Sequence, residues 1–467
     1  MSDALQASIE ECRGFLDALL KEGAYYADVK LYAEHGSQVA MRATSSDVQI
    51  FSKSVGVARV IYGKAWGIHV VEDPSKTSIK DACKYALKLA RVADSASILD
   101  TPIKLADVKQ VERNVAHEFK VNPLIVEVDE KIDLTKDLTQ RAKDVLKDSY
   151  GWSEVVYGDV ESDFSLVNSD GSQIREVTPS VDLLVYVAAR SGAVFESASK
   201  YVGYTKGYEA IEEIDRSRLV KEIADRALRL ASGKILPNTI RGQKPEVVMD
   251  SDCTGAFIHE VVGHPAEADF LLEAGSVFEN KLAKQVAVKE LTVCDDATLP
   301  GAYGAYAFDD EAVEARKICL VENGVLKSLL HTRETALELN AEPTGSAHGL
   351  THVPRCLMSN IYLEPRDWKS EELIKETKNG IFIQGVVRAQ STPAEGLFMI
   401  QPESATIIHN GELRETFRGV TITGKIEETL TAIDGIGNKP AMRATVEKEF
   451  NISDGGPPIR VSSLRVH

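Results

Sequence analysis

The first third of the chain alternates between helical and extended patterns of apolar residues. Apolar side chains between residues 9 and 20 recur every three or four positions, which predicts an amphipathic helix that stops at Gly23. Over residues 28–71 the period becomes two, as expected of antiparallel strands. Helical spacing returns over residues 78–90, where Ser78 is placed to cap the N-terminus of a second helix.

A polar and weakly patterned stretch, residues 94–122, follows these elements and is interpreted as a linker or surface crossing. A helix is predicted over residues 128–147, and the segment Asn168-Ser169-Asp170-Gly171 marks a hairpin turn between two strands. Another helix, over residues 215–231, leads to the Gly and Pro residues of segment 233–238. These Gly and Pro residues mark the predicted domain boundary.

These patterns predict an α+β chain in two main parts. The N-terminal α/β region, residues 1–237, is expected to be rich in sheet with flanking helices, and its subsegments lie at about 1–93 and 123–232. The C-terminal region, residues 243–467, alternates short apolar runs with glycine turns and is expected to be mixed and mainly β. Its two predicted helices lie near residues 252–264 and 370–379.

The balance of charge narrows the range of functions. The 467 residues include 54 Lys or Arg and 71 Asp or Glu, which gives a net charge of −17. Such a chain repels phosphate backbones and anionic membrane surfaces, so direct nucleic-acid binding and membrane binding are not expected. No stretch approaches the roughly 18 apolar residues of a membrane span, and the N-terminus lacks the basic and apolar regions of a signal peptide. We therefore expect a cytoplasmic protein.

The six cysteines are widely spaced and form no CxxC pair, which is typical of a reduced, cytoplasmic chain. Cys253 and Cys294 lie in apolar contexts and are expected to be buried structural thiols. No cysteine follows Cys356, which limits the choice of metal ligands near the C-terminus.

The densest candidate chemistry is the sequence His259-Glu260-Val-Val-Gly-His264, on a helix delivered by a short strand. Neutral imidazoles are good ligands for Zn²⁺, and a glutamate beside a ligand can act as a general base toward water. In a regular α-helix, however, residues five apart point about 140° away from each other. Gly263 and Pro265 both favour an interruption, and a π-type turn would also bring the two rings together, so we predict a distorted or terminating helix at residues 262–264.

The spacing alone leaves two interpretations open, a metal site or a satisfied pair of core or cap histidines. Further segments accompany the motif in a fixed order: residues 259–270, 275–278, 293–296, 308–311, 321–326, 343–345 and 358–362, with 27–29 and 56–59 near the N-terminus. Together they resemble the TldD metalloproteases of the TldD/PmbA family, over nearly the whole chain. The resemblance implies a zinc-dependent peptidase in which His259 and His264 bind the metal and Glu260 activates water.

The resemblance breaks at the expected third ligand. TldD sequences typically have a Cys in a glycine-rich segment near the C-terminus, whereas residues 438–450 contain none. Glu447 or Glu449 could supply a carboxylate from the same region and complete a His₂Glu set. The other candidate ligands are Glu267, Asp269 and the cluster His348, His352 and Cys356.

The motif and the resemblance together imply a metal-dependent peptidase that hydrolyses peptide bonds in unfolded polypeptides or small peptides. One metal ion is expected, with Zn²⁺ as the leading choice over Mn²⁺ or Fe²⁺. The resemblance implies a homodimer or a heterodimer with a PmbA/TldE-like paralogue. The alternative is a catalytically weak or inactive subunit that binds peptides or acts as a scaffold in a TldD/PmbA-type complex, and the missing Cys is its main support.

Overall fold

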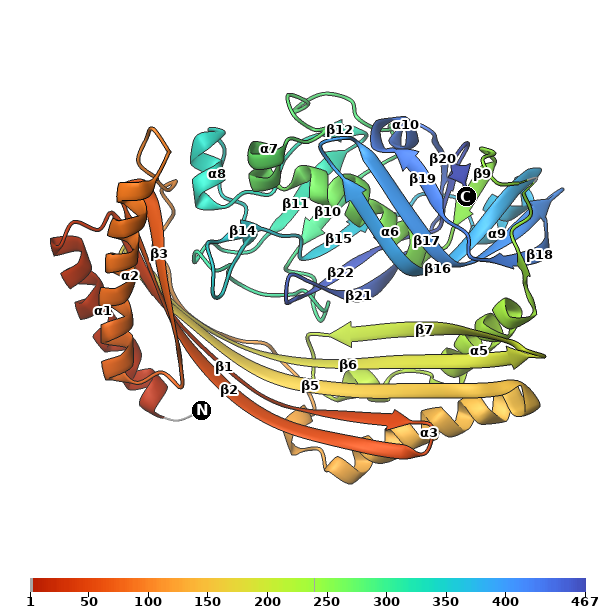
Figure 1. Ribbon diagram of the computed structural model, residues 1–467, viewed down its shortest axis with the longest axis horizontal. Coiled ribbons are helices and arrows are strands. Elements are labelled where there is room, and N and C mark those ends of the chain that lie inside the picture. Colours follow the sequence, from red (N-terminus) through yellow and green to blue (C-terminus); the bar gives the residue numbers. More distant parts are fainter. Residues whose placement is uncertain (1–2, 239) are drawn as a thin grey trace.

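The computed structural model describes residues 3–238 and 240–467, and its N-terminal part is built on one long, curved sheet (Figure 1). The strand order is β3-β2-β1-β5-β6-β4, and β7 also pairs with β6. All neighbours are antiparallel except β4 and β6, which are parallel. The strands are β1 (Tyr26–Arg42), β2 (Ser45–Tyr62), β3 (Ala65–Glu72), β4 (Glu112–Ala116), β5 (Tyr150–Asn168), β6 (Gln173–Ser191) and β7 (Val194–Tyr204).

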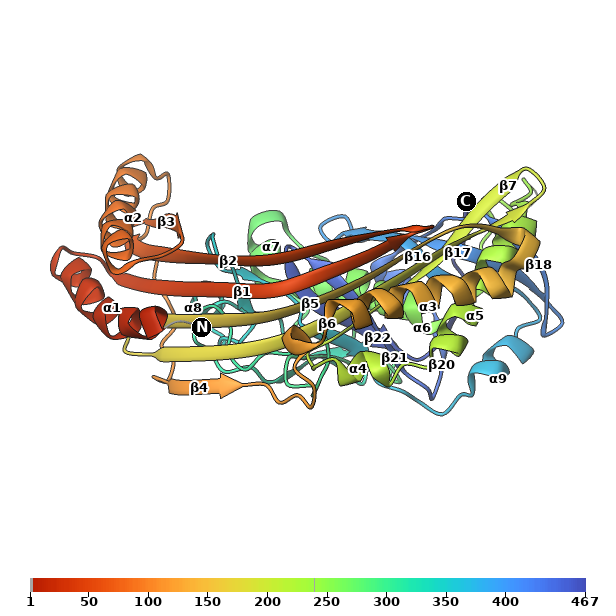
Figure 2. The same cartoon turned by 90° about the horizontal axis from the view of Figure 1, so that it is seen from below.

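Helices cover this sheet at two places. At one end α1 (Asp3–Lys21) and α2 (Lys76–Ala96) pack against the first strands, and at the other end α3 (Val128–Leu146) and α5 (Arg216–Ser232) lie on the outer face (Figures 1 and 2). A short helix, α4 (Glu209–Glu212), precedes α5. The predicted helices are thus present, and α1 stops at Gly23, which has a positive φ of 96°.

Two local predictions for this region need correction. Ser78 is not the N-cap of α2, because the cap is Ser75 and Ser78 occupies the third helical position, where the two serines form a reciprocal capping box. The stretch 94–122 is more than a linker, since β4 adds a parallel strand to β6. Strand β4 is short and exposed, so its sequence carries no alternating apolar pattern.

The C-terminal part contains two larger sheets. A nine-stranded sheet has the order β20-β23-β9-β16-β17-β18-β8 with β19 and β24 attached, and a six-stranded sheet has the order β12-β11-β10-β15-β22-β21. The first comprises β8 (Lys234–Ile235), β9 (Glu246–Met249), β16 (Asn379–Thr392), β17 (Leu397–His409), β18 (Glu412–Arg418), β19 (Ile422–Lys425), β20 (Ile433–Ile436), β23 (Ile459–Val461) and β24 (Arg465–Val466). The second comprises β10 (Val293–Asp296), β11 (Lys317–Glu322), β12 (Val325–Leu326), β15 (Asn360–Leu363), β21 (Ala441–Glu447) and β22 (Phe450–Gly456).

Five α-helices and a small hairpin complete the described C-terminal part. The hairpin pairs β13 (Ala347–His348) with β14 (Arg355–Cys356). The helices are α6 (Ser251–Ile258), α7 (Ala268–Ala274), α8 (Arg333–Glu338), α9 (Ser370–Lys375) and α10 (Ile426–Leu430). The predicted mixed, mainly β character of this region and the α+β class of the chain are confirmed. The boundary at residue 237 stays a prediction.

Buried charged groups attach the curved sheet to the C-terminal part. Lys30 on β1 places its Nζ 2.9 Å from Asp310 Oδ2 and donates to the carbonyl of Gly349 at 2.8 Å. Arg59 on β2 donates to the backbone carbonyl of Asp310 at 2.7 Å and is paired with the buried Asp28. Because these groups are buried, separating the two parts would expose or unpair charges at high energetic cost.

The prediction that Cys294 is a free thiol is wrong. Cys294 on β10 and Cys319 on β11 form a disulfide, because the two residues lie opposite each other on adjacent antiparallel strands with their Cα atoms 4.0 Å apart. Cys253 is a buried free thiol, as predicted, and burial raises its pKa well above the ordinary value. Within residues 3–238 and 240–467, no helix is both long and apolar enough to cross a membrane.

Candidate metal centre

The helix that carries the motif begins at a firm N-cap. β9 leads into Asp250, whose side chain accepts the backbone N–H of Cys253 at 2.8 Å. From this cap α6 runs against strands of both C-terminal sheets, and its last residues, Phe257 and Ile258, are fully buried. This packing fixes the direction in which the following histidines leave the helix.

The motif itself is not α-helical. Residues His259–Gly263 form a π-helix, in which the N–H of His264 bonds to the carbonyl of His259, and residues His264–Ala266 continue as a 3₁₀ turn. The predicted distortion at residues 262–264 is therefore confirmed. A π-turn brings residues five apart onto one side. Gly263 permits it to pack closely, because a Cβ there would lie 1.9 Å from Met358 Sδ.

The two histidine rings point at each other. Their Nε2 atoms are 3.2 Å apart, and one ring nitrogen of each histidine and a carboxylate oxygen of Glu260 all lie within 4.8 Å of one another. Two neutral nitrogens in this position repel through their lone pairs unless a proton or a cation lies between them. A tetrahedral zinc ion with Zn–N bonds of about 2.0–2.1 Å places two ligand nitrogens about 3.3 Å apart. The pair therefore fits a metal ion.

A carboxylate lies near the Nδ1 atom of each histidine, on the side of the ring away from the other histidine's Nε2. Asp454 Oδ2 on β22 is 3.8 Å from His259 Nδ1, and Glu267 Oε1 is 3.3 Å from His264 Nδ1. Metal-binding histidines commonly direct the second ring nitrogen to a carboxylate, which fixes the ring and its tautomer. Arg443 holds Asp454 in place with an Nε to Oδ1 bond of 2.9 Å.

Burial and neighbouring charges move the pKa values of the two histidines in opposite directions. Burial, with the positive charge of His264 second, lowers the pKa of His259 well below its ordinary value. For His264 burial alone would also lower the pKa, but the hydrogen bond and charge of Glu267 and the charge of Glu260 outweigh it and raise the pKa. His259 is thus held neutral, the form in which imidazole binds metals.

Glu260 is placed to handle protons beside the histidines. Burial raises its pKa, although the charge of His264 and a hydrogen bond from Ser391 act in the opposite direction. Ser391 lies near the end of β16 and donates its hydroxyl to Glu260 Oε2 at 2.8 Å. Its role was not evident from the sequence, because it lies far along the chain in an ordinary strand pattern.

The predicted third ligands flank the start of the β21–β22 turn: Glu447 ends β21, and Glu449 lies in the turn. The charge of Glu447 contributes to the raised pKa of Glu260. Lys448, at the tip, places its Nζ 3.2 Å from Glu267. The group of possible ligand atoms within 4.8 Å of one another comes from His259, Glu260 and His264, and it includes no atom of Glu447 or Glu449. Their assignment as metal ligands stays a prediction.

The remaining candidate ligands do not form a second centre among the described residues. His348 and Cys356 lie on paired strands, and His352 is exposed on the intervening loop. Asp269 is engaged elsewhere, because its Oδ2 lies 2.8 Å from Arg355 Nε.

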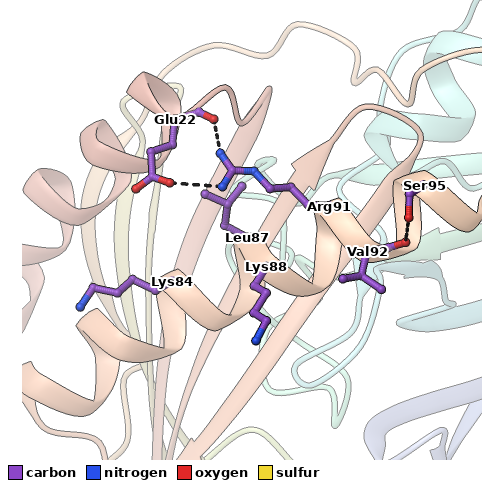
Figure 3. Close-up of a pocket in the computed structure, with 7 residues that line it drawn as sticks. All are labelled: Glu22, Lys84, Leu87, Lys88, Arg91, Val92 and Ser95. Carbon is purple, nitrogen blue, oxygen red and sulfur yellow. Dashed lines mark hydrogen bonds and ion pairs between the residues drawn. The ribbon is translucent and has the colours of Figure 1, made fainter.

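Two hollows flank different parts of the molecule. A cavity of about 570 Å³ lies between the curved sheet and the C-terminal part, close to the β21–β22 turn. A shallower hollow of about 450 Å³ lies between the end of α1 and α2 and is lined by Lys84, Lys88 and Arg91 (Figure 3). Since α1 and α2 lie at the end of the sheet remote from α6 (Figure 1), the smaller of these two hollows lies far from the histidine pair.

The chain matches known proteins over most of its length. Residues 242–467 match the model of the PmbA/TldA metallopeptidase C-terminal domain, and residues 121–231 match that of the central domain. A metalloprotease of Methanocaldococcus jannaschii is 34% identical over 444 residues, which cover 94% of this chain and 93% of that protein. The chain belongs to the PmbA/TldD metallopeptidase family.

Other similar proteins agree with membership of the PmbA/TldD family. The zinc metalloprotease TldD homologue of Saccharolobus solfataricus is 26% identical, covering 95% of this chain and 97% of that protein. A candidate modulator of DNA gyrase from Thermotoga maritima shares the fold with a TM-score of 0.80 and 20% identity, over 98% of this chain and 99% of that one. TldE from Thermococcus kodakarensis has a TM-score of 0.78 and 16% identity, with the same coverage.

Proposed function

We propose that this chain is a zinc-dependent peptidase that hydrolyses peptide bonds in unfolded polypeptides or small peptides. The observation that carries the proposal is the 3.2 Å approach of His259 Nε2 and His264 Nε2 with the Glu260 carboxylate beside them. A pair of core histidines has no need of a carboxylate at that place. The zinc metalloprotease name of the Saccharolobus solfataricus relative supports zinc as the metal.

In this proposal His259 and His264 hold the metal ion through Nε2. When bound, zinc polarises the scissile carbonyl and makes a neighbouring water more acidic. Glu260 takes the proton of the attacking water on Oε1, since Oε2 already accepts the hydroxyl of Ser391. The same carboxyl group then passes the proton to the leaving amine. Ser391 keeps the Glu260 carboxylate oriented through both transfers.

The third ligand is proposed to be a carboxylate of the β21–β22 turn, Glu447 or Glu449. Glu447 is favoured, because its charge already acts on Glu260. A His₂Glu set is a known arrangement for catalytic zinc. Zinc binding by Glu447→Gln and Glu449→Gln variants tests the assignment, since only the true ligand should lower zinc affinity strongly when neutralised.

The proposed assembly is a dimer, either of this chain with itself or with a PmbA/TldE-like paralogue, in the cytoplasm. The family membership and the structural likeness to TldE of Thermococcus kodakarensis support this proposal. Mass measurement of the chain alone and after mixing with a paralogue distinguishes the two forms.

The enzyme proposal is tested with Glu260→Gln and a matched control, Glu338→Gln, at an exposed position at the end of α8. We expect one zinc ion per chain in the wild type and in both variants. Hydrolysis of an unfolded polypeptide should fall by about 10²–10⁴-fold in Glu260→Gln alone. Absence of bound metal under zinc-replete conditions, or no hydrolysis by the wild type above background, would favour the peptide-binding scaffold instead. Equal hydrolysis by both variants would remove Glu260 from the proton transfers.

A further inference from the structure

The cavity of about 570 Å³ between the two parts of the chain has walls from both of them. Tyr32 and Glu34 on β1 and Ser162 on β5 form one wall. The opposite wall includes Tyr303 and Tyr306. Many of these side chains end in hydroxyl or carboxylate oxygens, so the cavity offers acceptors to a ligand rather than a purely apolar surface.

This cavity adjoins the metal centre through one strand and one turn. Asn451 and Ile452 on β22 line the cavity, and Asp454 on the same strand supports His259. Met358 also lines the cavity, and its Sδ packs against Gly263 in the π-turn. A substrate bound at the histidines would therefore lie beside the cavity, because only a few residues of β22 separate the two sites.

The charges that line the cavity are nearly all engaged. Lys53 pairs with Glu34 at 2.6 Å, and Asp310 pairs with Lys30. Glu176 accepts the backbone N–H groups of residues 307 and 308 and contacts a histidine at 2.6 Å. Among the described residues, no hydrogen bond or ion pair engages Glu449, although it lines the same cavity. One carboxylate thus remains free at the cavity wall.

A buried histidine also faces this cavity without a polar partner. His348 is only 8% exposed, and its ring lies between those of Tyr306 and Phe450, with centroids 4.9 and 4.7 Å away. Within the described residues the ring makes no hydrogen bond, and its nearest acidic neighbour, Asp310, is paired with Lys30. Burial lowers the pKa of His348 to about 4, so the ring is neutral and offers a lone pair as an acceptor.

We propose that this cavity binds a cationic side chain, Lys or Arg, of the peptide substrate, with Glu449 as its charge partner and His348 as a hydrogen-bond acceptor. This inference rests on the proposed peptidase function and adds a substrate preference to it. A cationic donor suits the cavity because its free polar groups are acceptors. An acidic side chain would meet the unpaired Glu449 and the other carboxylates, and like charges in such a site oppose binding.

The test compares N-acetylated peptides that differ at one position, occupied by Lys, norleucine, acetyl-lysine or Glu, with that position moved along the chain. Acetylation removes the terminal ammonium group, so any preference must come from the side chain. At the position that reaches the cavity, the wild type should cleave the Lys peptide about tenfold better than the norleucine peptide, measured as kcat/KM. Lack of any Lys preference at every position would overturn the proposal.

Three variants decide which residue is responsible. Glu449→Gln should lower the Lys-to-norleucine ratio of kcat/KM by about threefold to fivefold, since Glu449 is solvent-accessible. Glu449→Lys should shift the preference toward the Glu peptide, while Glu338→Gln should keep the wild-type ratio. An unchanged ratio in Glu449→Gln would overturn the proposal. Loss of zinc from that variant would also overturn it, by assigning Glu449 to the metal instead.

Binding measured without catalysis separates this inference from the peptidase proposal. Glu260→Gln keeps the cavity, so fluorescence anisotropy of labelled Lys and norleucine peptides reports their affinities directly. Tighter binding of the Lys peptide, reduced when Glu449→Gln is added, supports the cavity even if no peptide is hydrolysed. Equal affinities in a preparation whose parent hydrolyses peptides would reject the cavity and leave the peptidase intact.

Discussion

Replacing Gly263 with alanine is expected to destabilise the folded chain, although the same change stabilises an ordinary helix. Gly263 closes the π-turn that brings His259 and His264 together. A Cβ at this position would lie 1.9 Å from Met358 Sδ and 3.1 Å from Ile361 Cδ1. Met358 would have to retreat by about 1.6 Å to reach an ordinary van der Waals contact.

The magnitude follows from two opposing effects. Alanine gains about 0.5–1 kcal/mol over glycine in a helix. Forcing an extra carbon into a packed core costs about 1–3 kcal/mol, and Met358 is completely buried. We therefore expect Gly263→Ala to lower the free energy of unfolding by about 1–2 kcal/mol. Because the turn must shift to make room, zinc affinity should also fall by about tenfold or more.

Urea unfolding in the presence of a chelator measures the stability of the metal-free chain, and competition with a coloured chelator measures zinc affinity. Gly14→Ala in α1 is the matched control, because a Cβ there meets no atom within 4 Å, and it should stabilise by about 0.5–1 kcal/mol. The double variant Gly263→Ala/Met358→Ala should show a favourable coupling of about 1–2 kcal/mol. A Gly263→Ala chain as stable as the wild type would refute the packing argument. So would a double variant whose loss in free energy of unfolding equals the sum of the losses in the two single variants.

Three further predictions concern buried charged groups. Asp310→Ala should lower the free energy of unfolding by about 3–5 kcal/mol because it leaves the buried Lys30 without its charge partner, and adding Lys30→Met should restore about 2 kcal/mol in urea unfolding. Burial raises the pKa of Asp295 to about 7 against 3.8 in the unfolded chain, so its stabilising contribution is complete below about pH 4 and is lost as the pH rises through 7. From about pH 5 to about pH 8 the wild type should lose about 3 kcal/mol relative to Asp295→Asn. It should show no such loss relative to the exposed control Asp367→Asn, which retains Asp295. Asp454→Ala should weaken zinc binding by about 10–100-fold, with chelator competition as the readout, and an unchanged affinity would remove Asp454 from the metal centre.

The sequence was most informative where local chemistry decides the structure. The long helices and the turn at residues 168–171 follow from periodicity and turn residues, and both are present. The distorted turn at residues 262–264 followed from the geometry of two histidines five residues apart, with Gly263 and Pro265 beside them. In each case the relevant interactions lie within a few residues of one another.

The features that escaped prediction depend on residues far apart in the chain. Ser391 reaches Glu260 across 131 positions, and Cys294 meets Cys319 only because β10 and β11 are paired. No local pattern signals such contacts. The helices α7, α8 and α10 have five to seven residues each, too short to establish a helical period.

Strand β22 takes part in both the metal centre and the cavity, and this sharing limits how the molecule can change during evolution. Side chains alternate between the two faces of a strand, so inserting one residue before Asp454 would turn its carboxylate away from His259. Substitutions at Glu449 or Asn451 keep that register. We therefore expect substrate preference to diversify through exchanges of side chains along this segment, while its length stays constant.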